Sequence, residues 1–540
     1  MKKYLLVFYI LLVSIVIAFQ GCVKDKINLN QSGNNSISPQ YAGALVYSSL
    51  TLKDIMNNTN KNGQLTTDST GFVTLVYKGN LFSLKAADVV TIPTQTPVNG
   101  NTTLSAIEIT ALNALPPGGT ITFSDSSLVS FQTGGSAQVD ILNCKTATLA
   151  LNLNYNIKDN AVIKVTIPGA TLNGVVFTQT IQATYVNSPV NLIENYALDG
   201  YKIDMTNGNT THDVIKIRYD ITITKSANTS SIGEGVAFSE TFSNVTYNSI
   251  IGYLGQQFLS PNTDTIPITI FKNSIIGGGA TFNIVNPLIK VFLTNSYGLP
   301  ISAHFNTFEG YSPGQSTVAI TGAPNPIPIP TPTTIGQSAI DSFKLDNSNS
   351  NIVSLINNFP KNVIYNVSSQ SNPLGPVYNN FITDTSQFKI DMEIDLPLYG
   401  TVKNFMFQDT VAYSFNTNTD LVKSITVRAY IDNGFPIDVD MRIAFVDSAY
   451  NVIDELINPP YQLVMPSASI GSNGMVTSST SSSHDFTIPS TVIPQLNKVK
   501  HILIGAVANT INGGTTNVKI YDFYHLDVKL GVNVQLYLKF

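Results

Sequence analysis

Residues 149–157 read Leu-Ala-Leu-Asn-Leu-Asn-Tyr-Asn-Ile, and residues 215–223 read Ile-Lys-Ile-Arg-Tyr-Asp-Ile-Thr-Ile. Both stretches place an apolar side chain at every second position. Because neighbouring side chains of a β-strand point to opposite faces, this pattern buries one face and leaves the other in water, as in antiparallel sheets. Long helical patterns, which an α/β enzyme fold would need, are missing from the sequence. We therefore predict an all-β, multidomain protein of antiparallel β-sandwiches or extended β-sheet, with a few short helices.

The composition narrows the class of protein. The chain has 540 residues, a formal net charge of −5, 12% charged residues and 43% hydrophobic residues. This length exceeds what one hydrophobic core organises and suggests about three or four domains. The hydrophobic content argues against intrinsic disorder, and the slightly acidic balance argues against nucleic-acid binding, which needs a basic surface.

Proline-rich and polar segments indicate the domain boundaries. The clearest is the run from Pro324 to Pro332, which has five prolines in nine residues and favours an extended connection over a central strand. The predicted organisation is a signal peptide (1–21), a polar tether (22–40), two β domains (41–190 and 191–322), a Pro-rich linker (323–336) and one or more C-terminal β domains (337–540).

Two segments of the chain share a local pattern. Residues 289–301 and 425–437 each combine an alternating strand, a turn with Asn and Gly, and Pro-Ile at the next strand. A hairpin explains either segment alone, and their recurrence hints at internal duplication. With Asn286-Pro287 ahead of it, the first segment also resembles, over residues 282–305, the core of late-embryogenesis-abundant type 2 (water-stress) domains. That resemblance implies a β-sandwich with a binding or protective role and supplies no catalytic residues.

Two single elements are also predicted. Apolar side chains between Ile352 and Phe359 follow i, i+3, i+4, i+7 spacing before Pro360, which indicates a short helix. We expect this helix to pack on its own sheet rather than to dock a partner. Every second residue from 524 to 540 is apolar, which predicts a long strand that pairs within a soluble sheet.

The N-terminus carries the most specific signal. Lys2 and Lys3 precede an apolar run, residues 4–19, that matches the hydrophobic region of a secretory signal peptide. The run ends at residues 19–22, Phe-Gln-Gly-Cys, which resembles a bacterial lipobox, although Phe-Gln departs from its commonest residues. The resemblance implies that Cys22 is acylated. Acyl chains anchor a protein by burying methylene groups in a bilayer, so the membrane is a predicted partner through this lipid anchor.

The tether resembles that of Bacteroidota surface lipoproteins. Residues 23–26, Val-Lys-Asp-Lys, follow Cys22 directly, and a Lys with acidic residues at this place implies export to the outer face of the outer membrane. Only one acidic residue is present, so the periplasmic face stays open as an alternative. Four Asp-Ser or Asp-Thr motifs also resemble the O-glycosylation signal of exported Bacteroidota proteins, with candidate acceptors Ser69, Thr265, Thr410 and Ser448.

Residues for catalysis are not apparent. Cys144 has no partner once Cys22 is acylated, and its apolar neighbours indicate an inert buried thiol. The five histidines lack metal-ligand spacing and are interpreted as surface or core residues. Nucleophile-elbow and phosphate-loop motifs are missing as well. We therefore predict no catalytic residue, no cofactor and a protein that is not an enzyme.

Acidic residues provide a weak alternative. Asp391, Glu393 and Asp395 share one strand face by alternation, as do Asp438 and Asp440. If the two strands met, their carboxylates would suit a metal ion or the acid and base of a glycosidase. A solvated strand face explains the same pattern more simply.

These observations favour a membrane-anchored lipoprotein with a non-catalytic binding, adhesion or envelope-scaffold role at the cell surface. Another envelope protein is the expected type of partner. One alternative is a carrier of lipid or another apolar ligand in a β-lined cavity. Another is a surface component that binds or hydrolyses glycans, in which some of the 24 Tyr would replace the missing Trp as stacking platforms.

Overall fold

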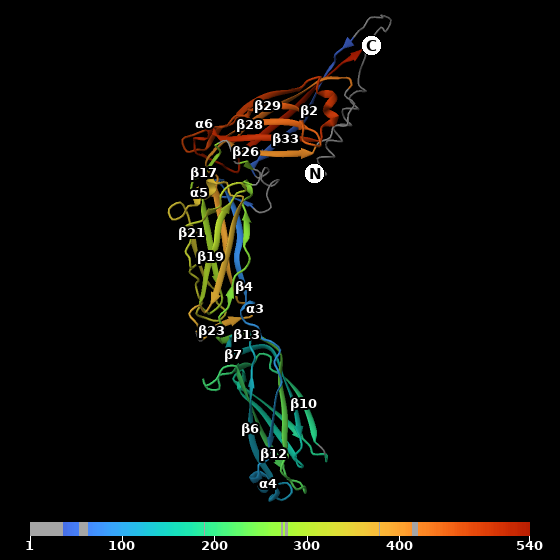
Figure 1. Ribbon diagram of the computed structural model, residues 1–540, viewed down its shortest axis with the longest axis vertical. Coiled ribbons are helices and arrows are strands. Elements are labelled where there is room, and N and C mark those ends of the chain that lie inside the picture. The colour runs from blue at the N-terminus through green and yellow to red at the C-terminus, as the bar shows by residue number, and fades with distance from the viewer. Residues whose placement is uncertain are drawn as a thin grey trace.

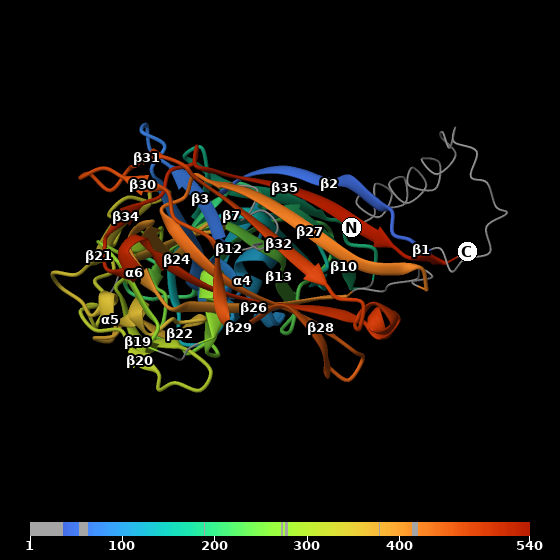
Figure 2. The same cartoon turned by 90° about the horizontal axis from the view of Figure 1, so that it is seen from above.

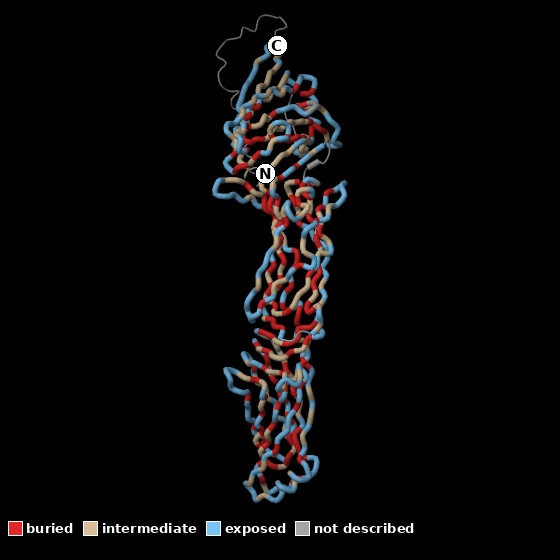
Figure 3. Tube along the Cα trace, turned by 90° about the vertical axis from the view of Figure 1, so that its left-hand side faces the viewer, coloured by how far each residue is buried: buried red, intermediate tan, exposed pale blue. Residues whose placement is uncertain are grey.

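The computed structural model describes residues 36–52, 63–187, 189–271, 274–275, 279–376, 379–412 and 420–539. The predicted signal peptide and Cys22 lie outside this part of the chain. The described residues form a long body of three β units stacked end to end (Figure 1), with buried residues along the inside of each unit (Figure 3). Antiparallel sheets dominate and helices are few and short, which confirms the all-β prediction.

The lower unit uses one contiguous stretch of chain. Its strands are β5 (Val98–Thr103), β6 (Thr120–Ser130), β7 (Gln138–Tyr155), β8 (Asn160–Leu172), β9 (Val175–Ala183), β10 (Val190–Ala197), β11 (Lys202–Asp204), β12 (Val214–Thr224) and β13 (Gly235–Tyr253). One layer has the order β10-β7-β13-β5 and the other the order β6-β12-β8-β9, and β11 joins β7 to β8. Helix α4 (Ala106–Asn113) lies at the tip (Figure 1).

Alternation along these strands builds the lower core. Leu149, Leu151 and Leu153 of β7 are fully buried, and Ile217 and Ile221 of β12 pack into the same cluster from the opposite layer. When the eight main strands are numbered in chain order, leaving out β11, the two layers read 6-3-8-1 and 2-7-4-5. This order is that of an eight-stranded jelly roll, and we call this unit the lower roll.

The middle unit repeats the same order. Its strands are β4 (Val73–Lys85), β14 (Phe258–Leu259), β15 (Asp264–Pro267), β18 (Leu288–Asn295), β19 (Ile301–Tyr311), β20 (Val318–Ala319), β21 (Ala339–Leu345), β22 (Asn362–Ser371) and β24 (Gln387–Pro397). The layers β21-β18-β24-β4 and β15-β22-β19-β20 again read 6-3-8-1 and 2-7-4-5 when β14 and β15 share position 2. Strand β3 (Gly63–Thr67) extends the first layer, and β23 (Asn380–Thr383) pairs with β13 of the lower roll. We call this unit the middle roll.

The upper unit is a third jelly roll within the described residues. Its strands are β2 (Gln40–Thr51), β26 (Phe405–Ala412), β27 (Val422–Asn433), β28 (Ile437–Val446), β29 (Val452–Met465), β32 (Thr480–Ile488), β33 (His501–Thr510) and β35 (His525–Leu536). Its layers are β32-β27-β35-β2 and β26-β33-β28-β29. We call it the upper roll.

Short elements connect or extend the rolls. They are β1 (Ser36–Ile37) with β36 (Leu538–Lys539), β16 (Ser274–Ile275) beside β26, the three-stranded sheet of β17 (Thr281–Ile284), β25 (Tyr399–Lys403) and β34 (Val518–Lys519), the pair β30 (Ser469–Ile470) and β31 (Val476–Ser478), and the helical turns α3 (Ala86–Val89), η1 (Thr269–Phe271), α5 (Ile352–Asn357), η2 (Ile493–Lys498) and α6 (Ile511–Gly514). Helix α5 begins where predicted. It packs on the core of its own roll, since Ile352, Leu355 and Ile356 are all buried.

The three rolls are nested. The lower roll is inserted between positions 1 and 2 of the middle roll, and the middle roll between positions 1 and 2 of the upper roll. In each roll the strand at position 1 pairs with the strand at position 8, as β4 does with β24 and β2 with β35. The upper and middle rolls are therefore closed by strands that are far apart in the sequence.

This nesting differs from the predicted domain boundaries. The division between 41–190 and 191–322 falls inside the lower roll, because β10 pairs with β7. The segment 323–336 connects two strands of the middle roll instead of separating domains. Its Ile327 is 2% exposed and bridges to Ala303, and the Pro330 carbonyl accepts a hydrogen bond from Asn295. Prolines exclude a regular strand there, but the intervening apolar residues still pack on the roll.

The predicted duplication corresponds to matching positions in two rolls. Asn295 ends β18 and Asn433 ends β27, both at position 3, and both side chains are fully buried. Each Oδ1 accepts from the backbone N–H two residues later, at 2.9 Å and 2.8 Å, and each Nδ2 donates to a proline carbonyl at 2.8 Å. The predicted hairpins are wrong in one respect, because each turn crosses from one layer of its roll to the other.

Candidate functional site

The candidate site is the outer face of sheet β2-β35-β27-β32 in the upper roll, where a surface hollow lies next to charged and metal-ligating types of side chain. We call it the outer sheet face. Figure 2 shows these four strands side by side. Inward side chains such as Ala429, Ile431 and Leu530 pack in the core. The alternate residues therefore point outward, away from that core.

The register aligns these outward residues in rows across the sheet. One row joins Ser49, Asp527, Asp432 and Ser481, the next joins Tyr47, Lys529, Tyr430 and Ser483, and the third joins Ala44, Gly531, Arg428 and Asp485. Each row thus crosses all four strands and brings together residues that are hundreds of positions apart in the sequence.

A broad hollow of about 1080 Å³ lies over the second and third rows. Its floor is low at Gly531, which lacks a side chain, and the nearest described atom to a Cβ built there lies 3.6 Å away. Tyr47 and Tyr430 remain 67% and 49% exposed beside it. Exposed tyrosine rings beside this hollow provide contact area and hydrogen bonds for a ligand with both apolar and polar surface.

Charged groups border the hollow. Arg428 pairs with Asp485 through two hydrogen bonds, one of them 2.5 Å from Nε to Oδ1. This pairing lowers the pKa of Asp485 and raises that of Arg428, so both remain ionised at neutral pH. The ammonium group of Lys529 lies 5.4 Å from the ring centre of Tyr47.

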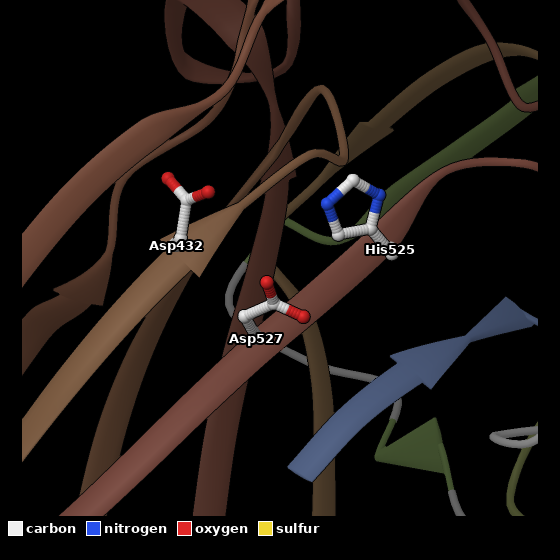
Figure 4. Close-up of side chains that lie close together, drawn as sticks. All are labelled: Asp432, His525 and Asp527. Carbon is white, nitrogen blue, oxygen red and sulfur yellow. The ribbon is translucent and has the colours of Figure 1, made fainter. Parts of the chain in front are cut away.

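Three metal-ligating side chains converge at the first row, next to the hollow. Asp432 of β27 and His525 and Asp527 of β35 each direct one donor atom into a common space, and these atoms lie within 4.8 Å of one another (Figure 4). Ser481 and Ser479 donate to the Asp432 carboxylate at 2.8 Å and 3.2 Å. Asp527 Oδ1 is shielded from solvent and has no hydrogen-bond partner among the described residues.

The predicted acidic site is not assembled. Asp391, Glu393 and Asp395 lie on β24 of the middle roll, whereas Asp438 and Asp440 lie on β28 of the upper roll, and the two strands belong to different sheets. The hypothesis of a glycosidase or metal site that joins them is therefore wrong.

Cations and amides already pair with the acids of β24. Glu393 forms ion pairs with Lys78 at 2.9 Å and Lys290 at 3.0 Å, and Asp395 pairs with Lys290 at 2.6 Å. Asp391 accepts from Asn80 at 2.8 Å. Partial burial favours the neutral form of Glu393, but the two lysines outweigh it and the net shift of its pKa is downward. This ladder of pairs accounts for the alternating acids as cross-strand contacts.

The acids of β28 have a different environment. Asp438 accepts a hydrogen bond of 2.6 Å from the Ser467 backbone N–H. Burial, and then the nearby Asp438 charge, raise the pKa of Asp440.

Other sequence-predicted residues take simple positions. The candidate glycosylation acceptors Ser69, Thr265, Thr410 and Ser448 are all exposed. Cys144 is 1% exposed, and burial raises its pKa to about 12, with the Asp199 charge as a smaller cause. The burial of Cys144 that its apolar neighbours predicted is confirmed.

A separate apolar cavity of about 310 Å³ lies where the upper and middle rolls meet. Its lining comes from both rolls and from β25 between them, and includes Leu75, Phe282, Phe405, Phe435 and Ala508. Small-molecule pockets span about 300–1000 Å³. The cavity therefore has room for a small apolar ligand.

Sequence reasoning missed the cluster at the first row. His525 and Asp527 are two residues apart on a strand with clear alternation, so their common face was visible in the sequence. Asp432 lies 93 positions before His525, and only the register of β27 with β35 places it opposite Asp527.

None of the helices in the described part of the chain is long and apolar enough to cross a membrane.

Comparisons with known proteins add little to this geometry. No family model matches the chain, and no curated protein does. Among solved structures, a protein from Parabacteroides distasonis described as secreted is 11% identical, with a TM-score of 0.26, and the match covers 51% of this chain and 82% of that one. An archaeal virus chain with a triple jelly roll fold is 12% identical, with a TM-score of 0.10 and coverage of 83% and 97%. The subviral particle protein of infectious bursal disease virus is 9% identical, with a TM-score of 0.12 and coverage of 83% and 82%. Scores this low transfer neither fold nor function to this chain.

Proposed function

We propose that this protein is a lipid-anchored, non-catalytic binding protein of the bacterial cell surface. Its elongated stack of rolls would carry binding surfaces away from the membrane. The observation that carries the proposal is the position of the two ends: β1, the first described strand, pairs with β36 at one end of the body, and helix α4 lies at the other (Figure 1).

An anchor at Cys22 would act close to the upper roll. Cys22 precedes Ser36 by 14 residues, which span at most about 50 Å when fully extended. The lower roll would then be the part of the molecule farthest from the bilayer. The lipobox and tether resemblances, the exposed glycosylation motifs and the polar outer sheet face all suit display in this orientation.

The test is fractionation and protease treatment of intact cells that express either the wild type or Cys22→Ala. We expect the wild type to be in the membrane fraction and to be degraded by added protease. The Cys22→Ala chain should leave the membrane fraction. A wild-type protein that resists protease until the outer membrane is permeabilised would refute surface display, and a membrane-bound Cys22→Ala chain would refute the anchor.

A second candidate function, transport or storage of an apolar ligand, is favoured by the cavity between the upper and middle rolls. Its lining is almost entirely apolar, so burial of an alkyl chain there would contribute about 0.8 kcal/mol per methylene. The bound group would be an uncharged chain or ring, since none of the described residues that line the cavity is charged.

Native mass spectrometry and titration with a fluorescent, uncharged fatty-acid ester test this candidate. Ala508→Leu, which fills part of the cavity, should lower the affinity for the probe at least tenfold. Ala412→Phe, on an exposed part of β26, is the matched control and should leave it unchanged. Equal binding by both variants and the wild type would exclude this cavity as the ligand site.

A further inference from the structure

We propose that Asp432, His525 and Asp527 bind one divalent first-row transition metal ion, zinc in the first instance. The inference does not depend on the proposed function, because it rests only on the arrangement of these side chains on the outer sheet face.

The first argument is the direct opposition of two carboxylates. Asp432 and Asp527 are cross-strand partners in the antiparallel pairing of β27 with β35. Like charges placed opposite each other destabilise a sheet. Among the described residues no lysine or arginine forms an ion pair with either carboxylate; Lys529, the nearest cation in the register, lies over Tyr47 instead. A bound cation would convert this repulsion into attraction.

The second argument is independent of charge. Asp527 Oδ1 is shielded from solvent and finds no hydrogen-bond partner in the described part of the chain, although buried polar atoms are almost always paired. An unpaired carboxylate oxygen in such a place costs free energy of folding unless something binds it. The carboxylate group that carries this oxygen shares a common space with Asp432 and His525, and an ion bound in that space would coordinate the carboxylate.

The donor set selects the type of ion. Calcium and magnesium prefer shells made entirely of oxygen, whereas an imidazole nitrogen with two carboxylates suits zinc and its neighbours. Three protein ligands leave at least one coordination position for water or for an oxygen of a bound ligand. Ser479 and Ser481 donate hydrogen bonds to the Asp432 carboxylate and would thereby fix its orientation toward the metal ion.

The experiment is a zinc titration of the purified full-length Cys22→Ala chain against a chromophoric chelator. The Cys22→Ala chain, in which all three proposed metal ligands are present, should bind one zinc ion per chain. Asp432→Asn, His525→Gln and Asp527→Asn should each weaken binding at least tenfold. Asp485→Asn removes a carboxylate from the same sheet face but outside the cluster, so it is the matched control. It should bind zinc as tightly as the Cys22→Ala chain without further substitutions.

Two further results separate a metal site from a merely structural cluster. Zinc should raise the melting temperature of the unmodified chain but not that of Asp527→Asn. Without zinc, Asp527→Asn should melt no lower than the unmodified chain, since it removes the repulsion with Asp432. Failure of the Cys22→Ala chain to bind zinc, or binding that stays equally tight when Asp432→Asn, His525→Gln or Asp527→Asn is added, would overturn the proposal. Displacement of zinc by millimolar calcium would overturn the choice of a transition metal.

Discussion

At the scale of single residues, the buried asparagines at the ends of β18 and β27 hold the crossings between layers. Each satisfies a buried backbone N–H and the carbonyl of a half-buried proline. Asn295→Ala and Asn433→Ala should each lower the free energy of unfolding by about 2–4 kcal/mol, because the N–H and the carbonyl both lose a hydrogen bond. Urea denaturation measures this cost.

Asn99→Ala, at an exposed position of β5, provides the control and should change the free energy of unfolding by less than about 0.5 kcal/mol. If Asn295→Ala were as mild as this control, the asparagine would not hold the crossing.

Glu240 gives a second prediction at this scale. It is fully buried in the lower roll, where Ser127 and Tyr219 donate to it, and burial raises its pKa above the ordinary 4.5 despite these hydrogen bonds. The folded state therefore holds this proton at a pH at which the unfolded state has lost it. The contribution of Glu240 to the free energy of unfolding is therefore fully present below about pH 4.5. It decreases as the pH rises from there toward the pKa of Glu240 in the folded state.

Glu240→Gln removes the titration and keeps the shape. The variant should gain stability relative to the wild type by at most about 1.4 kcal/mol per pH unit above pH 4.5, until the folded pKa is passed. Chemical denaturation of both proteins from pH 4 to pH 8 measures this difference. A difference that stays constant over this range would show that Glu240 is already ionised in the folded protein.

Single residues also show what the sequence could reveal. The burial of Cys144 followed from its apolar neighbours. The partners of Glu393 and the orphaned oxygen of Asp527 did not, because both depend on strands that lie far away in the sequence.

At the scale of elements, strand β35 closes the upper roll. It pairs with β2 on one side and β27 on the other, and Leu526 and Leu530 pack against the core. A chain truncated after Tyr524 should therefore lose the upper roll. The lower roll should remain, because all of its strands lie between Val98 and Tyr253.

Limited proteolysis with mass spectrometry tests this prediction. Cleavage of the truncated chain should concentrate in residues 405–524, while residues 98–253 resist as they do in the full chain. Early cleavage throughout the lower roll would show instead that the rolls unfold as one unit.

Strands were the part of the fold that the sequence predicted well. Period-two alternation marked β7, β12 and β35, and helical spacing marked α5. Pairing could not be predicted, because an alternating strand reveals which face is buried but not which strand lies beside it. For the same reason, a strand and turn that read as a hairpin proved to cross between layers.

At the scale of the whole molecule, nesting places the first and last strands together at one end. Domain boundaries read along the sequence missed this, because proline-rich segments mark irregular backbone and not the limits of a core. The continuous hydrophobic cluster shared by the lower and middle rolls, and the pairing of β23 with β13, favour a fixed arrangement of these two rolls. Display at a distance from a membrane requires such a fixed arrangement.

The most direct test of this account is surface labelling at the far tip. Ile107 of α4 is 82% exposed, and the remaining thiol, Cys144, is buried with a raised pKa and should not react. A membrane-impermeant maleimide applied to intact cells should label Ile107→Cys and leave the wild type unlabelled. Labelling of Ile107→Cys only after the outer membrane is permeabilised would contradict display of the lower roll at the cell surface.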